Sequence, residues 1–420
     1  MRIIISFVFL FLLPLTTQSQ WVSNVHIQGN KRTRKAFIEK IIHLREGMEL
    51  DSSLIEQDIY RLKRLPSVAH AYFQVSPTEK EEAYNVVYGI EENFTLIPFA
   101  SIYTTNNDEF AFRLGLQEFN AMGNNIILGG FYQKDVFDSY SFHVRAPYLF
   151  GRRFGVAFSY QNLTTQEPVF LDDGTADYRY NNESFELLGL YQFGLRHNLE
   201  LGFNIFTEDY QYLFGSTASD VPQSFKVDKY LYKLIYSYDA IQYNYQYLSG
   251  FKSTLNVQYV HSVDEQRLPK FIIGFNDFIF FKRIGKKGNW ANRLRLGLSS
   301  NLDTPFAPFA VDNNLNIRGV GNTIDRGTAA IVLNTEYRHT LLDEKWLVVQ
   351  GNFFVDGGSW RNPGGNFSDF GDNQNLRVYP GVGIRLIHKH IFNAIFRIDY
   401  GYGITSDSSK GFVFGIGQYF

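Results

Sequence analysis

Alternation of apolar and polar residues over short segments is the feature that most constrains the fold of this 420-residue chain. Successive residues of a β-strand point to opposite faces, and a tilted strand of roughly ten residues crosses a lipid bilayer. We therefore predict an all-β transmembrane barrel of about 16 antiparallel strands. The expected strands span 94–104, 109–119, 125–134, 138–145, 153–161, 181–192, 196–207, 228–239, 251–263, 269–283, 289–300, 328–339, 346–356, 376–387, 393–404 and 411–420.

The composition agrees with a barrel and excludes several other classes of protein. Aromatic residues make up 17% of the chain, and membrane barrels carry aromatic girdles at both lipid interfaces. No segment contains about 18 consecutive apolar residues, so we expect no transmembrane helix. The net charge of -2 gives no nucleic-acid footprint, and the absence of cysteine excludes disulfides, thiolate metal sites and a lipoprotein anchor.

The connections between these segments alternate in length, as expected for up-and-down strands. Short turns such as Asn120–Asn124 and Pro147–Gly151 are predicted on the periplasmic side. An even number of strands places both ends of the barrel on that side, together with the domain that precedes it. The longer loops are expected on the outer side, at 162–180, 208–227, 301–327 and 357–375.

Residues 1–20 have the pattern of a secretory signal peptide. Arg2 supplies a positive start, and Ile3–Leu13 forms an apolar core that is too short to cross a bilayer. Pro14 breaks that core, and small residues up to Ser19 provide a cleavage site. We therefore expect an exported protein.

Residues 21–93 predict a small α+β domain on the periplasmic side. Helical spacing of apolar residues follows Thr33 and again follows Asp51, and both residue types are favourable helix caps. One apolar segment precedes the helices and two alternating segments follow them, so the predicted order is β-α-α-β-β. A strand edge of such a domain could bind extended polypeptide; the alternative is a plug or spacer.

A single arginine stands out in the loop predicted at 301–327. Arg318 lies within Asn314–Asn322, where apolar residues and glycines replace the polar residues of an ordinary loop tip. The segment Phe354–Gly358, with Asp356 at its centre, follows at the end of a predicted strand. An ion pair between the arginine and this aspartate requires the loop to fold back into the barrel, where a low dielectric strengthens it.

Alternation also places several charged side chains inside the barrel. Apolar residues such as Leu333 and Val355 are expected to face lipid, so the charged residues next to them face the lumen. Unpaired buried charges are energetically costly, so we predict that these side chains form a network of ion pairs that includes Arg318. The alternative is a water-filled lumen with charged walls, as in porins. The predicted lumenal charges are Glu336, Arg338, Asp356, Arg385, Arg397 and Asp399.

The first and last strands must pair with each other to close the barrel. Pro98 in the first strand cannot donate a ladder hydrogen bond, and Gly411, Gly415 and Gly417 weaken the last strand. Both features predict a weak seam, although the glycines could instead make room beside aromatic neighbours. The last strand is expected to turn one apolar face to lipid, formed by Phe412, Phe414, Ile416 and Phe420.

The loop motif and the strand motif, in this order and before a barrel-type C-terminus, resemble those of the BamA-like superfamily of outer-membrane protein insertases and translocators. The first domain resembles a POTRA domain in its element order, its early Gly29-Asn30 pair and its closing segment Val86–Glu92. The chain has room for one such domain. In this family POTRA domains receive client polypeptides, so the resemblance implies the same role here.

The resemblance also implies roles for residues of the barrel. Arg318 and Gly319 would lock the loop inside the barrel through Asp356, with Glu336 as a second acceptor. A weak seam would be the place where client strands enter sideways. A terminal Phe420 resembles the signal by which barrels are delivered for insertion.

We expect a protein without enzymatic activity, cofactor or metal. The sequence has no Gly-x-Ser-x-Gly, phosphate-loop or His-Glu-x-x-His motif, and the strand neighbours His261 and Ser262 point to opposite faces. The expected function is an insertase or translocase in the outer membrane of a Gram-negative bacterium, which accepts unfolded outer-membrane or secreted proteins without nucleotide. Outer-membrane lipid, periplasmic chaperones and accessory subunits are the other partners considered. The alternative is a passive or gated pore for solutes.

Overall fold

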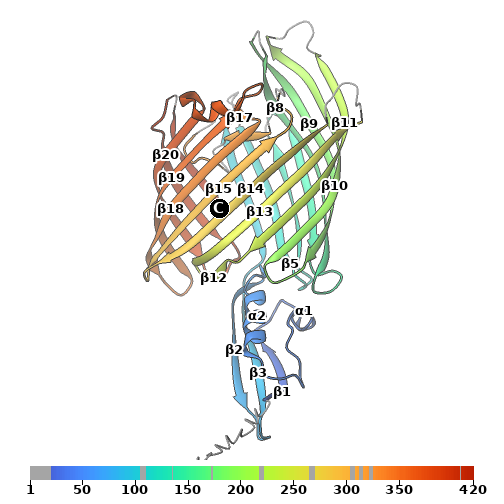
Figure 1. Ribbon diagram of the computed structural model, residues 1–420, viewed down its shortest axis with the longest axis vertical. Helices are drawn as coiled ribbons and strands as arrows, with labels where there is room; N and C mark the ends of the chain where they lie inside the picture. Colours follow the sequence, from blue (N-terminus) through green and yellow to red (C-terminus); the bar gives the residue numbers. More distant parts are fainter. Residues whose placement is uncertain are drawn as a thin grey trace, which may run out of the picture.

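A barrel forms one end of the molecule and a small α/β domain forms the other (Figure 1). The computed structural model describes residues 20–104, 110–134, 136–171, 174–216, 222–263, 270–302, 308–311, 316–320, 325–406 and 408–420. Residues 1–19 of the predicted signal peptide lie outside the described residues. Among the helices that are described, none is long and apolar enough to cross a bilayer.

The small domain has the predicted β-α-α-β-β order. Its elements are β1 (Trp21–Gln28), α1 (Lys35–Ile41), α2 (Ser52–Leu62), β2 (Val68–Pro77) and β3 (Ala83–Glu92). The three strands form one sheet in the order β1-β3-β2, with β1 parallel and β2 antiparallel to the central strand. Apolar residues of both helices and of the sheet, such as Ile38, Leu62 and Tyr88, form one buried core.

The two predicted helix caps have different outcomes. The carboxylate of Asp51 accepts a hydrogen bond of 2.8 Å from the Ser53 N–H and caps α2 as expected. The prediction that Thr33 caps α1 is wrong, because α1 begins one residue later, after Arg34. The Thr33 hydroxyl instead accepts a hydrogen bond of 3.1 Å from Asn120 of the barrel.

The barrel closes in chain order, with the last strand next to the first. Its strands are β4 (Leu96–Thr104), β5 (Phe110–Ala121), β6 (Ile126–Lys134), β7 (Asp138–Ala146), β8 (Phe154–Leu171), β9 (Gly174–Gln192), β10 (His197–Gly215), β11 (Ser224–Asp239), β12 (Gln242–Asn244), β13 (Tyr247–Ser262), β14 (Phe271–Ile284), β15 (Gly288–Ser299), β18 (Ala329–Asp343), β19 (Leu347–Arg361), β20 (Leu376–His388), β21 (Ile395–Tyr402) and β22 (Lys410–Ile416). Strand β12 continues β11 in the same register against β13. If β11 and β12 are counted as one strand, the described residues form a barrel of sixteen strands, as predicted.

Side chains of the barrel wall alternate between the outer face and the lumen as predicted. Leu333 and Phe353 are 52% and 69% exposed on the outer face. Glu336 and Asp356, which lie on the same two strands with the opposite parity, are 1% and 0% exposed. The wall thus directs its charged residues inward, where they can meet the loop that carries Arg318.

The predicted outer loops at 162–180 and 208–227 are largely wrong, because strand structure continues through most of both segments. Strands β9 and β10 each have 19 residues, and with their neighbours they rise above the rest of the barrel (Figure 1). Tyrosines continue the alternation here and pair across strands: the rings of Tyr180 and Tyr210 are 4.8 Å apart, and the Tyr180 hydroxyl donates to Glu208 at 2.9 Å. Such cross-strand pairs stabilise the extended part of these strands.

The loop predicted at 301–327 folds into the barrel. It contains a short hairpin of β16 (Phe309–Val311) and β17 (Asp325–Gly327). Ile317, Arg318 and Val320 between them are at most 1% exposed. Residues Asn314, Leu315, Gly321 and Asn322 of the sequence motif lie outside the described residues.

Strand β19 is longer than predicted. It continues to Arg361, so Asp356 lies within the strand and not at its end. The following connection contains two 3₁₀ helices, η1 (Phe367–Gly371) and η2 (Asn373–Asn375). The extension places the aspartate inside the barrel rather than at its rim.

The last strand is shorter than predicted, and the expectation that Phe420 faces lipid is wrong. Strand β22 ends at Ile416, because Gly417 has a φ of +89° that few other residues adopt. The final residues turn inward: Tyr419 is 4% exposed, and Phe420 packs against a buried cluster inside the barrel. Of the residues predicted to share one apolar face, Phe412, Phe414 and Ile416 lie exposed on the outside of the barrel.

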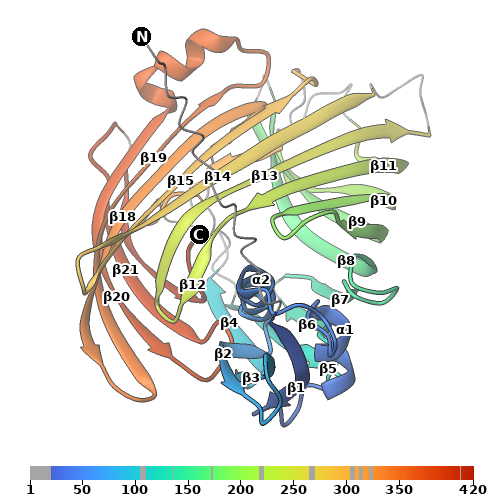
Figure 2. The same cartoon turned by 60° about the horizontal axis from the view of Figure 1, so that its bottom comes forward.

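The small domain is docked against three connections at one end of the barrel (Figure 2). The Arg34 N–H donates to the Gly123 carbonyl at 3.0 Å in the β5–β6 turn. The rings of Phe37 and Tyr148 meet edge to face at 5.7 Å in the β7–β8 turn. Helix α2 reaches the β11–β13 hairpin, where Arg64 forms an ion pair with Asp239. The two parts are therefore joined by these contacts as well as by the chain segment that runs from β3 to β4.

Candidate functional site

Arg318 is the centre of the candidate site. Its guanidinium donates two hydrogen bonds to Asp356, from Nε at 2.8 Å and from Nη2 at 3.0 Å, in a bidentate pair. Its Nη1 donates to Glu336 Oε2 at 2.6 Å and lies 3.6 Å from Asp399 Oδ1. The Arg318 backbone N–H also donates to Asp356 at 3.0 Å. One loop residue is thus held by carboxylates from β18, β19 and β21.

Two aromatic rings enclose the same guanidinium. The ring of Phe354 lies 3.6 Å from the Arg318 guanidinium carbon, and the ring of Tyr419 lies 4.6 Å away. Arginine stacks favourably on aromatic faces, particularly where water is excluded. Because the side chain is fully buried, the rings also shield its ion pairs from solvent.

Below the guanidinium, the loop backbone contacts strand β21 and the residues before β22. A Cβ on Gly319 would come within 2.7 Å of Gly401, so both positions require glycine for this approach. The Ser409 hydroxyl lies 3.1 Å from the Gly319 carbonyl oxygen and 2.8 Å from that of Val320. The Tyr379 hydroxyl, from β20, lies 3.1 Å from the same serine. The loop therefore touches every strand from β18 to β21 and the start of β22.

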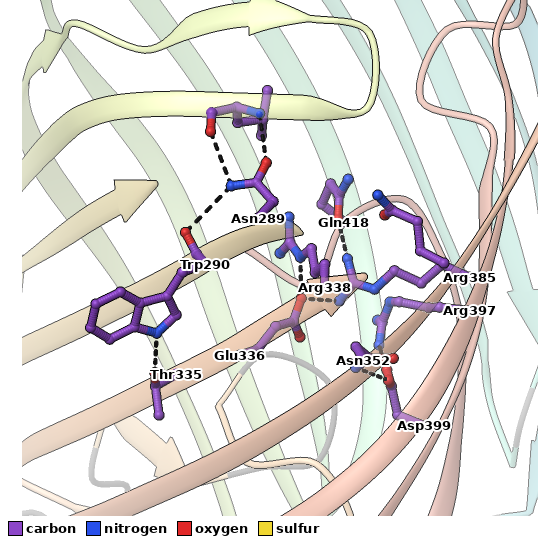
Figure 3. A network of polar contacts seen from close by, with 12 residues as sticks. Asn289, Trp290, Thr335, Glu336, Arg338, Asn352, Arg385, Arg397, Asp399 and Gln418 are labelled. Atoms are coloured by element: carbon purple, nitrogen blue, oxygen red, sulfur yellow. Dashed lines mark hydrogen bonds and ion pairs between the residues drawn. The ribbon is translucent and has the colours of Figure 1, made fainter. Parts of the chain in front are cut away.

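Glu336 connects the lock to a wider network of arginines (Figure 3). Its Oε1 accepts from Arg338 and from Arg385, while its Oε2 accepts from Arg318. Arg385 also donates to the side chain of Gln418, just beyond the last strand. The Gln418 side chain therefore belongs to the lumenal network.

Asp399 accepts from the fourth arginine of the network, Arg397. Arg397 donates to it at 3.1 Å, and the Asn352 amide donates to it at 3.0 Å (Figure 3). The network thus contains four arginines and three carboxylates within the barrel. Charges buried this deeply are stable only when paired, so removing one member leaves its partners exposed to a large desolvation cost.

Apolar residues of the loop complete the anchor. Ile317 and Val320 belong to a buried cluster with Val332, Trp360 and Tyr379 of the barrel wall. Ile317 is 0% exposed. The loop is therefore held by packing as well as by charge, which agrees with its apolar sequence.

The opposite side of the lumen has a different character. Arg145 pairs with Glu200, Lys233 with Glu186 and Lys229 with Glu208, and all six residues share the inner face of the wall by alternation. Their side chains keep part of their solvent exposure, from 13% to 37%. Strands β7 to β11 thus line a wet region, whereas β18 to β22 enclose the packed loop.

The predicted seam residues do not form part of the lock. Pro98 lies on the exposed outer face of β4. A Cβ on Gly415 would come within 2.6 Å of the Arg397 guanidinium carbon, so this glycine makes room for a lumenal arginine and not for an aromatic neighbour, as the alternative had it. Gly417 turns the chain inward. Phe420 places its ring 5.6 Å from the guanidinium carbons of Arg293 and Arg338.

Sequence reasoning missed several residues of the site. Gly401 and Ser409 carry no recognisable signal, because their role depends on a contact with a distant loop. Tyr419 was assigned to a strand that does not reach it. Phe354 could have been found, since it is the first residue of the Phe-x-Asp-x-Gly motif and forms the platform for Arg318.

Comparison with known proteins identifies the class of domain and the fold. Residues 21–93 match the family model described as POTRA, surface antigen variable number repeat. The structure is similar to BamA from Haemophilus ducreyi lacking POTRA domains 1-3, with a TM-score of 0.56, 13% identity, and coverage of 95% of this chain and 84% of that chain.

Two further solved structures share the fold. CdiB from Acinetobacter baumannii matches with a TM-score of 0.60 and 14% identity, over 96% of this chain and 74% of that chain. CdiB from Escherichia coli matches with a TM-score of 0.60 and 13% identity, over 94% and 75% respectively. These matches confirm the predicted architecture, a POTRA domain followed by a BamA-like barrel.

Proposed function

We propose that this protein is an outer-membrane insertase or translocator for unfolded polypeptide. The observation that carries the proposal is the buried lock, in which Arg318 from a long loop is fully buried and paired with carboxylates on three strands. A loop that braces one side of a barrel suits a wall that opens at another place. The shared fold with BamA and CdiB supports the same interpretation.

Reception of the client would begin at the POTRA domain. The outer edge of β1 is covered, because the Val22 N–H bonds the Met48 carbonyl and the Gly47 N–H bonds the Val22 carbonyl, both at 2.8 Å. Strand β2 pairs only with β3 among the described residues, and Val75 on it is 40% exposed. An open edge of this kind binds extended chains through main-chain hydrogen bonds and demands little of their sequence.

Insertion would draw on the folding of the client itself. Each apolar side chain that moves from water into lipid contributes about 1.5–3 kcal/mol, and strand pairing satisfies the main-chain groups, so no nucleotide is needed. The junction of β22 and β4 is the expected place of entry, because β22 has 7 residues and β4 contains Pro98. The brace on β18 to β22 would hold one side of that junction fixed.

A solute pore is the second candidate function. The partly exposed ion pairs of the wet region, such as Arg145 with Glu200, favour it because they resemble the wall of an aqueous channel. A pore would conduct steadily, and its conductance would not depend on the POTRA domain.

Reconstitution into liposomes tests the proposal. Urea-unfolded barrel protein is added to liposomes that contain the full-length protein, its Arg318→Ala variant, or no protein, and folded product is followed by its resistance to protease. The proposal predicts faster folding with the wild-type protein and a loss of most of this acceleration in the variant. No acceleration, together with a large steady conductance that the variant retains, would support the pore instead.

A further inference from the structure

A short strand edge projects from the barrel beside the POTRA domain. Pairing between β10 and β11 ends at Tyr238 of β11. The last hydrogen bond across this side of β11 runs from the Asp239 N–H to the Arg196 carbonyl at 2.8 Å. Beyond this point the chain continues as β12, which pairs with β13 and with no other strand among the described residues. All three residues of β12 are exposed, and they lie next to α2 (Figure 2).

The hydrogen bonds of the neighbouring strand show which main-chain groups of β12 are free. Leu248, the register partner of Tyr243, donates its N–H to Asn289 Oδ1 at 2.7 Å and accepts from Asn289 Nδ2 at 3.0 Å. Figure 3 shows Asn289, which lies on β15, with these bonds to the main chain of β13. The Tyr243–Leu248 pair is therefore a non-hydrogen-bonded pair of the antiparallel ladder. Consequently the N–H and C=O of Tyr243 point to the outer edge.

A cavity of about 460 Å³ lies between this hairpin and the POTRA domain. Tyr60 of α2 and Lys63, which directly follows this helix, form one wall, and all of β12 with Tyr247 and Arg283 forms the other. This volume is in the range of ligand-binding pockets. The walls are preformed, because the Tyr60 hydroxyl bonds the Asp239 carbonyl at 3.2 Å and Arg64 pairs with the Asp239 carboxylate.

The charges around the cavity favour an acidic occupant. The half-buried Lys63 ammonium makes no hydrogen bond or ion pair with the described residues, and burial lowers its pKa. The Arg283 guanidinium stacks on Tyr247 at 4.2 Å and donates one hydrogen bond to the Lys286 carbonyl. Among the described residues that line this cavity, the exposed Glu56 is the only carboxylate. Two cations therefore face one anion.

We propose that the edge of β12 and the adjoining cavity form a second binding site for extended polypeptide, with preference for acidic segments. The peptide would add a strand next to Tyr243, and its carboxylates would meet Lys63 and Arg283. The proposal rests on the proposed function, because it assigns a docking point for the same client between the β2 edge and the barrel mouth. The exposed edge of β12 is short, so this site suits a transient contact with the polypeptide rather than a stable complex.

Peptide binding to the full-length protein in detergent tests the site. The probe is a fluorescein-labelled decapeptide of alternating Val and Asp, and the control probe carries Lys in place of Asp. Tyr243→Pro removes the edge N–H but no ladder hydrogen bond, and Tyr243→Val is its matched control. We expect the Pro variant and a Lys63→Glu/Arg283→Glu variant each to bind the acidic probe about tenfold more weakly, which corresponds to about 1.4 kcal/mol. Unchanged binding in the charge-reversed variant overturns the site, even if the Pro variant does not fold.

Photo-crosslinking separates this site from the proposed function. A photoreactive residue replaces Gln242 on β12 or Val75 on β2. The site is supported if position 242 crosslinks to the acidic probe and if an excess of unlabelled probe prevents this crosslink. Crosslinks at position 75 alone overturn it but leave the proposed reception of polypeptide intact. Crosslinks at neither position contradict both.

Discussion

The backbones of Gly319 and Gly401 lie against each other inside the barrel. A Cβ on Gly319 would come within 2.7 Å of the Gly401 carbonyl oxygen, and a Cβ on Gly401 would overlap the carbonyl oxygen of Arg318. This contact is independent of charge, and it joins the loop to β21 in addition to the bonds with Asp356 on β19. The loop therefore acts as a brace across the closing strands and not only as an ion pair.

Substitution of Gly401 by Ala should displace the loop. The added methyl group meets backbone atoms, which cannot move aside, so we expect a loss of about 1–3 kcal/mol of stability and a loss of activity. Gly357→Ala on β19 is the matched control, because its Cβ would find nothing closer than 3.6 Å. Protease cleavage within the loop reports the displacement. Equal protection in both variants would show that the close approach has no role.

Removal of the Arg318 side chain should impair function while the barrel remains inserted. Arg318→Ala leaves Asp356 without its bidentate partner in a buried position, and breaking a buried pair costs about 3–5 kcal/mol. Arg145→Ala is the control, because its pair with Glu200 is partly exposed and is worth about 0–1 kcal/mol. Heat resistance of the barrel on gels and client insertion are measured together. If the Arg318 variant inserted client protein at the wild-type rate, the buried ion pair would have no role in function.

Reversal of one interface charge should release the POTRA domain from the barrel. Arg64→Asp places two carboxylates together at the contact with Asp239, whereas Arg64→Asp/Asp239→Arg restores an attractive pair. Distances between spin labels on the two parts should broaden in the single variant and narrow again in the double variant. A distribution that stays narrow in the single variant would show that the other contacts suffice.

Acidification should loosen the POTRA loop that contacts the barrel. Burial raises the pKa of Glu92, but hydrogen bonds from the N–H groups of Thr33, Arg32 and Lys31 outweigh it, so the pKa lies below its ordinary value. A lowered carboxyl pKa stabilises the folded state above the ordinary pKa of about 4.3, and this contribution is lost as the pH falls through the folded pKa.

Hydrogen exchange of these three amides measures the effect. After correction for intrinsic rates, their protection should fall below about pH 4 in the wild-type protein and should be nearly independent of pH in Glu92→Gln. Protection that falls equally in both proteins would assign the acid response to another group.

Local sequence patterns predicted the wall of the barrel well because alternation is a local property. The parity of Glu336 and Asp356 follows from neighbours two residues away, and the same rule placed Arg385 and Asp399 in the lumen. The POTRA domain was equally predictable from the sequence, since helix spacing and strand alternation occur within about 70 residues. Short-range periodicity was sufficient for both.

Long-range contacts explain what could not be predicted. Gly401 and Ser409 matter only because a loop about 90 residues earlier lies against them. The inward turn at Gly417 depends on Arg385 and the lumenal network that receives Gln418, and the alternation of the preceding residues gave no sign of it. The long hairpins of β9 and β10 were taken for loops because strand length was limited to the thickness of a membrane.

Quantitative proteomics of the outer membrane and the culture medium after depletion of this protein tests the central claim most directly. An insertase or translocator predicts the loss of client proteins: many barrels for a general assembly factor, or a few surface or secreted proteins for a dedicated one. Unchanged levels of every outer-membrane and secreted protein, together with altered uptake of small solutes, would contradict the account and favour a pore.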